Sequence, residues 1–471
     1  MAGRPARAAT RNAGHGVQRC INVVCAATYG LGERIYLCPR CGETLEIVCR
    51  LAAPTDREAM RKQWTSRRAR RAWSVDPRES SGVWRYLEML PFEDDAPFVT
   101  LSEGNTPLFE APRSAGYCGL ARLRLKHQGY NPTGSFKDTG MAAAMTQAVI
   151  SGARTALCAS TGNTAASLAA YAARAGLEAA ILLPRGQVSA SKLAQSLDYG
   201  ALVLEIDGNF DACMLLVKEL GDDPSIYIAN SINPFRIEGQ KTVAFELIEQ
   251  CQWRVPDHIV VPGGNMGNST ALGKGFQELL DLGMIDRLPK LSVIQAEGAA
   301  PLARLFANLN FPGPAGDEQI PEKLEPVENP RTLATAIRIG APVSWKKALR
   351  AVLHSGGQII SVSEQELADA KAMIGRDGIG SEPASATTVA GIKKLVASGH
   401  IVGNDDVVAI LTGHALKDPD YMIRYHEGTL SFAAGGKQDL ESRPFAGAFR
   451  NAPERAAATK AAILSSLERR R

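Results

Sequence analysis

Residues 130–140 read YNPTGSFKDTG and join a run of turn-forming residues to the start of a helix. The Asn, Pro and Gly residues favour a turn, and the residues from Lys137 onward predict a helix for which Ser135 can serve as the N-cap. Lys137 then lies in the first helical turn, where the helix dipole destabilises an ammonium group and partial burial lowers its pKa further. A neutral amine can form a Schiff base. The alternative is a surface lysine whose charge Asp138 partly offsets.

From about residue 150 onward, short β-rich runs alternate with alanine- and leucine-rich helical segments. The β-rich runs are 155–160, 179–184, 201–207, 225–230, 258–264, 291–298, 357–363 and 407–413. Continuous apolar strands separated by helices predict an α/β fold with a parallel sheet covered on both faces. Several of these strands end in Gly, Ser, Thr or Asn, and ligands of open α/β sheets bind at the carboxyl ends of the strands.

Polar or glycine-rich segments follow three of these predicted strands. STGNT at 160–164 offers hydroxyls and free N–H groups for a carboxylate or phosphate, unless it is simply a well-capped helix start. GGNMGN at 263–268 can form a backbone nest for a phosphate, but it lacks the lysine of a nucleoside-triphosphate loop. Thr412 follows the last strand, and its hydroxyl could hydrogen-bond a heteroaromatic nitrogen. His414 nearby is given no role.

Five of the nine cysteines lie within residues 20–49. Four of them have the C-x4-C and C-x2-C spacings that can supply thiolates to a tetrahedral metal site. They are Cys20, Cys25, Cys38 and Cys41. The alternatives are a structural zinc ion and a metal-free ribbon, and Cys49 is left over in both. The scattered remaining cysteines favour a reducing, cytoplasmic compartment.

The composition is that of an ordinary globular protein, with 45% hydrophobic and 22% charged residues among 471. No apolar run is long enough to span a bilayer. The net charge of +4 gives no general argument for a nucleic-acid or membrane partner. The one basic run, at 61–71, ends in RRARR (67–71), which lies between Trp64 and Trp73. It predicts either a nucleic-acid patch or, as the favoured interpretation, a connector whose tryptophans pack on the body.

Taken together, these segments resemble the threonine synthase family within the fold-type II pyridoxal-phosphate enzymes, which are similar to the tryptophan synthase β subunit. The resemblance covers most of residues 20–420. Besides the motifs above, it rests on SGVWRYLEMLPF (81–92), LSEGNTPLF (101–109), NSINPFRIEGQKT (230–242), TLATAIRIGAPVSW (332–345) and GSEPASATTVAG (380–391). It implies two three-layer α/β domains with parallel-rich sheets and a small N-terminal zinc-ribbon-like segment.

The expected organisation has six parts. They are a disordered leader (1–18), a zinc-ribbon-like segment (19–50), a connector with the start of the large domain (51–127), a small mobile domain (128–240), a large cofactor-binding domain (241–424) and a peripheral C-terminal tail (425–471).

The resemblance also implies a role for each matching residue. Lys137 would form the Schiff base and later shuttle protons, and Phe136 would lie by the cofactor ring. Asn163 would hydrogen-bond the 3′ oxygen and Thr412 would face the pyridine nitrogen. The cofactor phosphate would be held by Gly263, Gly264, Asn265, Met266, Gly267 and Asn268. The substrate carboxylate or phosphate would be bound by Ser160, Thr161, Thr164, Ser231 and Arg236.

The implied reaction converts O-phospho-L-homoserine and water into L-threonine and phosphate in a cytoplasmic homodimer without nucleic-acid or membrane partners. Thr139 stands where many relatives carry a cation that can meet the substrate phosphate, so two alternatives with the same cofactor remain. These are a cysteate synthase acting on phosphoserine and a threonine dehydratase. An alternative of another class is a zinc-ribbon nucleic-acid-binding protein with an inactive enzyme body.

Overall fold

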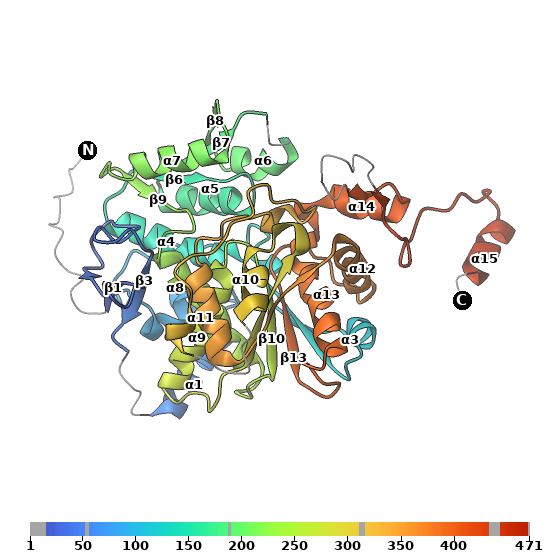
Figure 1. Cartoon of the computed structure of the whole chain (residues 1–471), viewed down its shortest axis with the longest axis horizontal. Helices are drawn as coiled ribbons and strands as arrows, with labels where there is room; N and C mark the ends of the chain where they lie inside the picture. Colours follow the sequence, from blue (N-terminus) through green and yellow to red (C-terminus); the bar gives the residue numbers. More distant parts are fainter. Residues whose placement is uncertain (1–15, 52–55, 187–189, 310–315, 433–442, 470–471) are drawn as a thin grey trace.

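Two sheets form the body of the chain, whose computed structural model describes residues 16–51, 56–186, 190–309, 316–432 and 443–469 (Figure 1). The larger sheet has the order β12-β11-β10-β13-β5-β4, and all its neighbouring strands are parallel except β4 and β5. Its strands are β4 (Leu108–Glu110), β5 (Leu123–His127), β10 (His258–Pro262), β11 (Lys290–Ala296), β12 (Ile359–Val362) and β13 (Val407–Leu411).

The smaller sheet is entirely parallel, with the order β8-β7-β6-β9. Its strands are β6 (Thr155–Ala159), β7 (Glu178–Pro184), β8 (Leu202–Ile206) and β9 (Ile226–Ile228). Every β-rich run that the sequence predicted contains a strand, and the α/β class with parallel-rich sheets is confirmed. The predicted runs did not include β4 and β5.

Helices α4 (Lys137–Ile150) and α8 (Phe235–Gln250) pack together, and α4 begins with Lys137 while α8 carries Arg236 in its first turn. Their approach is so close that a Cβ atom on Gly239 would overlap the carbonyl oxygen of Thr139. The other main helices are α3 (Pro112–Cys118), α5 (Asn163–Ala175), α6 (Ala190–Asp198), α7 (Phe210–Leu220), α9 (Gly267–Asp281), α10 (Pro301–Leu309), α11 (Trp345–Ser355), α12 (Glu364–Arg376) and α13 (Pro383–Ala397).

Strand β5 is buried along its whole length although it carries two cations. Arg124 pairs with Asp406 at 2.6 Å, and the Lys126 ammonium contacts Glu246 and donates to the carbonyl oxygen of Thr106 at 2.7 Å. Buried charges are tolerated when they are paired and hydrogen-bonded. These partners allow a charged strand to lie between β13 and the edge strand β4.

The N-terminal ribbon comprises the antiparallel strands β1 (Gly16–Cys20), β2 (Thr28–Tyr29) and β3 (Leu45–Cys49), in the order β2-β1-β3. Part of the predicted leader, residues 1–15, lies outside the described residues, but residues 16–18 already belong to β1. The ribbon therefore begins earlier than predicted, because Gln18 is buried and its amide nitrogen donates to the carbonyl oxygens of Gly30 and Glu33 at 2.8 and 2.7 Å.

The connector contains α1 (Arg57–Ala69) and α2 (Pro77–Ser80). Only one of its two tryptophans packs on the body, whereas the sequence analysis expected both to do so. Trp64 is fully buried, whereas Trp73 is 77% exposed. Four arginines of the basic run bond to described partners, three of them to partners outside α1 and α2 and one, Arg70, within the connector. The pairs are Arg61 with the Met284 carbonyl at 2.6 Å, Arg67 with Glu88 at 2.7 Å, Arg68 with Glu249 at 3.8 Å and Arg70 with Glu79 at 2.6 Å.

The C-terminal region is less peripheral than predicted. The boundary expected at residue 424 falls inside α14 (Pro419–Glu427), whose Tyr421 and Tyr425 lie one helical turn apart and are both buried with Phe445. The short strands β14 (Ser431–Phe432) and β15 (Arg443–Pro444) follow, and α15 (Lys460–Glu468) projects away from the body (Figure 1). None of the described helices is both long and apolar enough to cross a membrane.

Candidate active site

The loop before α4 lies directly against the loop after β13. The backbone N–H of Phe136 donates to the carbonyl oxygen of Thr412 at 2.9 Å, and that of His414 donates to the carbonyl oxygen of Gly134 at 2.9 Å. Ser135 and Gly413 form the bridge between these bonds. Two segments almost 280 residues apart in the sequence are therefore held together by main-chain bonds, as the convergence of strand ends predicted.

Lys137 begins α4, as predicted, but Phe136 and not Ser135 is the N-cap residue, and the Ser135 hydroxyl accepts a hydrogen bond from the Lys137 N–H at 3.4 Å. The Lys137 Nζ atom lies 4.1 Å from the centroid of the Phe136 ring. Burial and the positive charge of Arg236 lower the pKa of Lys137 to about 7, against the opposing effect of Glu382. Near neutral pH, a large fraction of this amine is uncharged.

The alternative interpretation, in which Asp138 offsets the charge of a surface lysine, does not match the structure. Asp138 is fully buried, and its carboxylate accepts hydrogen bonds from the Thr133 amide at 2.7 Å and the Thr133 hydroxyl at 2.6 Å. Burial raises the pKa of Asp138 to about 6. Asp138 therefore holds the turn that precedes Lys137 in place.

Glu382, a residue that the sequence analysis did not predict, bridges Asn163 and Thr412. These two residues follow strands of different sheets, β6 and β13. The side-chain amide of Asn163 donates to Glu382 Oε2 at 2.9 Å, and the hydroxyl of Thr412 donates to Glu382 Oε1 at 3.0 Å. Burial raises the pKa of Glu382, which is only 4% exposed. A single carboxyl group therefore links the start of α5 to the end of β13.

The surroundings of Glu382 allow this close approach. A Cβ atom on Gly413 would overlap the Glu382 carboxyl group. Ser385, in the first turn of α13, accepts hydrogen bonds from the N–H groups of Thr412 and Gly413 at 2.8 and 3.2 Å. The available sequence signal was the segment GSEPASATTVAG (380–391), which contributed to the resemblance without any residue being given a role.

The predicted phosphate loop, Gly263 to Asn268, connects the end of β10 to the start of α9. Met266 adopts a left-handed conformation with φ of 65°. The Asn268 side chain is 5% exposed, and neither its oxygen nor its nitrogen has a partner in the described part of the chain. Because unpaired buried amides are costly, this loop fits an anion that would accept hydrogen bonds from Asn268 and the helix N-terminus.

The predicted substrate residue Ser231 lies beside the phosphate loop. The side-chain nitrogen of Asn265 donates to the Ser231 hydroxyl at 2.8 Å, and its oxygen accepts from the Val343 amide at 2.8 Å. Asn230 in turn pairs with the backbone of Ala159, at the end of β6, at 3.1 and 3.0 Å. This pairing places Ser231 near the segment that carries Ser160, Thr161 and Thr164, which are all partly exposed.

Arg236 lies in the first turn of α8 and is buried. Its Nη1 donates to the carbonyl oxygen of Ala229 at 3.0 Å, while its Nε has no partner among the residues that the structure describes. Burial lowers the pKa of Arg236 to about 10, and its charge is felt at Lys137. Its position fits the predicted role in binding an anion beside Lys137.

A second lysine near the site, Lys417, was also missed. Its Nζ donates to the side chain of Gln195 on α6, and its Cε lies 3.0 Å from where a Cβ on Gly134 would be. Burial lowers the pKa of Lys417, against the effects of Asp138 and Glu382. Lys417 therefore lies over the turn that precedes Lys137 and reaches the helix that follows β7.

Together these groups suit an aromatic aldehyde that carries a phosphate. Lys137 supplies an amine of lowered pKa, and Phe136 supplies an aromatic face beside it. Asn163 and Thr412 supply polar groups from two sides, and the loop before α9 supplies a phosphate cradle. These residue types and their convergence fit pyridoxal phosphate.

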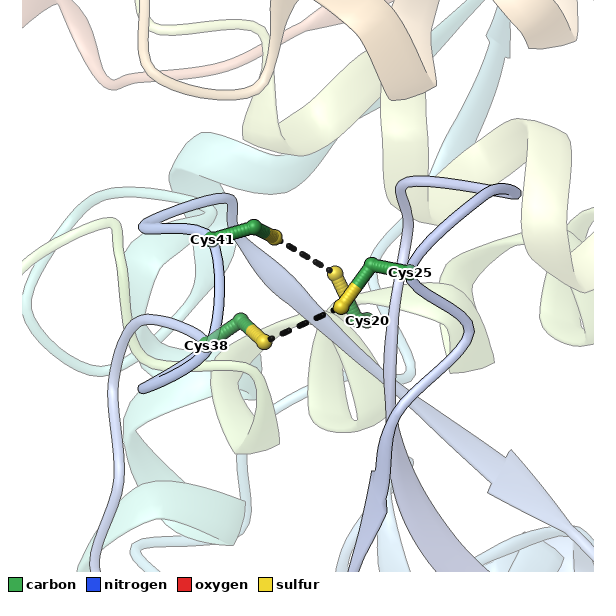
Figure 2. Close-up of side chains that lie close together, drawn as sticks. All are labelled: Cys20, Cys25, Cys38 and Cys41. Carbon is green, nitrogen blue, oxygen red and sulfur yellow. Dashed lines mark hydrogen bonds between the residues drawn. The ribbon is translucent and has the colours of Figure 1, made fainter.

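The four cysteines of the ribbon form a separate cluster (Figure 2). Their sulfur atoms all lie within 4.8 Å of one another, with Cys20 and Cys41 at 3.4 Å and Cys25 and Cys38 at 3.7 Å. Four thiolates at 2.3 Å from a tetrahedral zinc ion would be about 3.8 Å apart. Cys49 lies elsewhere, beside Glu238 and Lys241. The cluster could therefore hold a metal ion.

Comparisons with known proteins agree with this site. A family model described as a pyridoxal-phosphate dependent enzyme matches residues 99–413. The threonine synthase of Methanocaldococcus jannaschii is 45% identical over 412 residues, which cover 87% of this chain and 95% of the relative. The threonine synthase of Synechocystis is 42% identical, over 79% of this chain and 92% of the relative.

Solved structures share the fold at low sequence identity. The processed form of threonine deaminase isoform 2 from Solanum lycopersicum is 19% identical, with a TM-score of 0.55, over 66% of this chain and 79% of that one. Maize serine racemase is 21% identical, with a TM-score of 0.54, over 66% of this chain and 88% of that one. These two likenesses concern the fold alone.

Proposed function

The chain belongs to the threonine synthase family of pyridoxal-phosphate-dependent enzymes, and we propose that it converts O-phospho-L-homoserine and water into L-threonine and phosphate. The observation that carries the proposal is the amine of Lys137, whose pKa is lowered to about 7, beside the linked side chains of Asn163 and Thr412. Relatives named threonine synthase that span most of this chain support the choice of reaction.

When bound, pyridoxal phosphate would withdraw electrons from the α-carbon of an amino-acid substrate. Lys137 would hold the cofactor through its amine, with Asn163 and Thr412 at the ring and Gly263 to Asn268 at the phosphate. Once released by the substrate, the Lys137 amine can take a proton from the α-carbon and return protons at neighbouring carbons. An amine with a pKa near 7 suits both directions of proton transfer.

The anion-binding groups orient the substrate. Arg236 offers a buried guanidinium whose Nε has no partner among the described residues. The Ser231 hydroxyl accepts a hydrogen bond from Asn265 of the predicted phosphate loop. Ser160, Thr161 and Thr164 offer hydroxyls at the start of α5. A guanidinium fork matches phosphate oxygens well. Holding a doubly anionic substrate at two ends fixes the reacting carbons near Lys137.

A substrate assay separates this proposal from the alternatives with the same cofactor. Phosphate release and the amino-acid product are measured with phosphohomoserine, phosphoserine and threonine. We expect L-threonine and phosphate from phosphohomoserine. Turnover of phosphoserine or threonine alone would contradict the proposed substrate while leaving the cofactor assignment intact.

Borohydride trapping tests the role of Lys137 without depending on turnover. Reduction of the cofactor-loaded protein, followed by peptide mapping, is expected to place one pyridoxyl group on Lys137. Lys137→Ala should lose this adduct, whereas Lys290→Ala, a change at an exposed lysine at the start of β11, should keep it. An adduct on another residue would overturn the site.

We propose that the cysteine cluster binds one structural zinc ion. All four ligand positions are filled by sulfur, which leaves none for a substrate. Metal analysis of the purified protein should find about one zinc per chain. Substitution Cys38→Ser should lose it, and Cys49→Ser, at the cysteine outside the cluster, should retain it. Zinc-free wild-type protein after growth with added zinc would refute the assignment.

The nucleic-acid alternative has less support. Three arginines of the basic run bond to residues outside the connector helices and a fourth bonds to α2, which favours a structural role for α1. The homodimer and the cytoplasmic location implied by the resemblance stay predictions. Sedimentation of the cofactor-loaded protein measures the first of these.

A further inference from the structure

A cavity of about 310 Å³ lies between α12, α14 and the chain near residue 450. The residues of α12 that line it recur at helical spacing and form one face of that helix. Its polar and aromatic lining includes Lys371, Arg376, Tyr421, His426, Phe449 and Arg450. None of the residues predicted to bind cofactor or substrate lines it.

Two buried polar groups in this lining lack partners. Lys371 is 8% exposed, and in the described part of the chain its ammonium forms no ion pair and no hydrogen bond, although the carboxylates of Asp418 and Glu382 favour its charge from beyond ion-pair distance. Tyr421 is 4% exposed, and its hydroxyl is likewise without a partner among those residues. Burying such groups unpaired costs free energy. A ligand that accepts hydrogen bonds would remove this cost.

The other cations of the cavity also lack ion pairs with described residues. The Arg376 guanidinium lies 4.9 Å from the centroid of the Phe449 ring, which leaves its N–H edges open. Arg450 donates to the carbonyl oxygen of Phe445 at 2.7 Å. The nearby carboxylate of Asp369 is occupied by the hydroxyl of Tyr425 at 3.0 Å and the side-chain amide of Gln365 at 3.0 Å.

A larger cavity of about 680 Å³ under the N-terminal ribbon provides the contrast. Three of its four lysines and arginines are paired with carboxylates: Arg350 with Asp317 at 2.8 Å, Arg19 with Glu46 at 2.7 Å, and Lys274 with Glu238. The fourth, Lys347, donates to the carbonyl oxygen of Leu45 at 3.1 Å. Each of these cations therefore has an acceptor within the described part of the chain, whereas Lys371 in the smaller cavity has none there.

We propose that the cavity between α12 and α14 binds a small organic anion, whose carboxylate or phosphate group accepts hydrogen bonds from Lys371 and Tyr421 and faces the guanidinium groups of Arg376 and Arg450. The phenyl ring of Phe449 forms part of an apolar wall for the rest of the ligand. Arg376 and Arg450 are exposed at the entrance, while Lys371 and Tyr421 lie buried within.

The cavity is connected to the active site through three consecutive residues. Gly380 lines the cavity, and its carbonyl oxygen accepts a hydrogen bond from His127 Nε2 at 2.6 Å. Ser381 bridges to His414. Glu382 donates its N–H to the Gly413 carbonyl at 2.9 Å and holds Asn163 and Thr412 through its side chain. An anion in the cavity can therefore alter catalysis through the position of Glu382.

Calorimetric titration of the cofactor-loaded protein tests the binding, with inorganic phosphate and succinate as separate probes. We expect at least one probe to bind the wild type and to bind the Arg376→Gln/Arg450→Gln double variant at least tenfold more weakly. The matched control is Arg424→Gln, which changes an exposed arginine of α14 outside the cavity and should bind like the wild type. Which probe binds identifies the anionic group.

Phosphate bound at the active site would be retained by all variants, so only the difference between variants reports on the cavity. Binding of neither probe, or equal binding by the double variant and the wild type, would overturn the proposal. The rate measured without probe should be equal in the double variant and the wild type. A probe that binds should change the kcat/KM of the wild type at least twofold and that of the double variant less. Because binding is measured without substrate, a wrong substrate assignment would not affect this result.

Discussion

Lys137 shows how one position combines three effects on a single amine. The start of a helix, burial and the neighbouring Arg236 all disfavour its charged form. With a pKa of about 7, half of the amine is neutral at pH 7, whereas an ordinary lysine would be only about 0.03% neutral. The rate of cofactor capture by the cofactor-free protein should therefore rise with pH and reach half its maximum near pH 7, as followed by absorbance in a stopped-flow instrument.

Arg236→Gln provides the control for this pH dependence. Removing a positive neighbour raises the pKa of Lys137, so the midpoint should move to higher pH and capture at pH 7 should slow. Arg424→Gln, far from the site on α14, should leave the midpoint unchanged. A midpoint that remains near the ordinary lysine value in the wild type would contradict the effect of burial on this amine.

Glu382 is the residue whose loss should affect the cofactor most after Lys137 itself. In Glu382→Ala, both Asn163 and Thr412 lose their acceptor, whereas in Glu382→Gln the side-chain oxygen can accept from Asn163 and the side-chain nitrogen can donate to the Thr412 hydroxyl. Each lost hydrogen bond contributes about 0.5–1.5 kcal/mol, so cofactor affinity should fall about tenfold in Glu382→Ala and less in Glu382→Gln. Fluorescence titration with pyridoxal phosphate measures the change. Unchanged affinity in both Glu382→Gln and Glu382→Ala would show that the bridge has no role in binding.

Lys417 can supply the positive charge that Thr139 does not. The Thr139 hydroxyl donates back to the Phe136 carbonyl at 3.0 Å, and the residue is buried against α8. Lys417 lies over Gly134, in the turn that precedes Lys137 and α4. Lys417→Met should raise KM for phosphohomoserine about tenfold, because a tenfold change corresponds to the free energy of one lost hydrogen bond to a charged group. The change in kcat should be smaller. Lys393→Met, on α13, is the control, and an unchanged KM in Lys417→Met would exclude a role in binding the phosphate ester.

Among the elements, the contact between α4 and α8 controls the distance between Lys137 and Arg236. A methyl group on Gly239 would overlap the Thr139 carbonyl, so Gly239→Ala must push the helices apart. We expect a loss of about 1–3 kcal/mol in the free energy of unfolding in urea, with a raised KM. Gly116→Ala on α3 has open space and should be neutral or stabilising. If both variants behaved alike, the close approach would not matter.

The elements also show where prediction from sequence succeeds. Strands β6 to β13 are uninterrupted or nearly uninterrupted apolar runs and were all predicted. Strand β5, LRLKH, carries charges that suggest exposure, and only its partners Asp406 and Glu246, distant in sequence, make its burial possible. The motifs around Asn163 and Thr412 were predicted because each follows a predicted strand, and the motif around Lys137 was predicted because turn-forming residues precede a helix. Glu382 is the N-cap residue of α13 and follows no strand, so only the folded arrangement identifies it.

At the scale of the whole molecule, the proposed cofactor site is built from residues that follow strands of both sheets. A ligand that binds only the folded state stabilises it by mass action, by about 4 kcal/mol at a thousandfold excess over Kd. Cofactor should therefore raise the melting temperature of the whole chain in differential scanning calorimetry, and Lys137→Ala should lose most of this increase. An equal increase in Lys137→Ala would argue that the cofactor binds outside the proposed site.

The attachment of the N-terminal ribbon has a consequence for how its sequence can vary. Two lysines hold strand β3 by its main chain. Lys274 Nζ donates to the Ile47 carbonyl oxygen, and Lys347 Nζ donates to the Leu45 carbonyl oxygen at 3.1 Å. These bonds use main-chain oxygens and need no sulfur. A descendant of this protein could therefore exchange its thiols for other side chains and keep the strand, whereas deleting the strand would remove the acceptor of Lys347 and leave Lys274 with Glu238 alone. Drift is thus expected to replace the four clustered cysteines before it removes the ribbon.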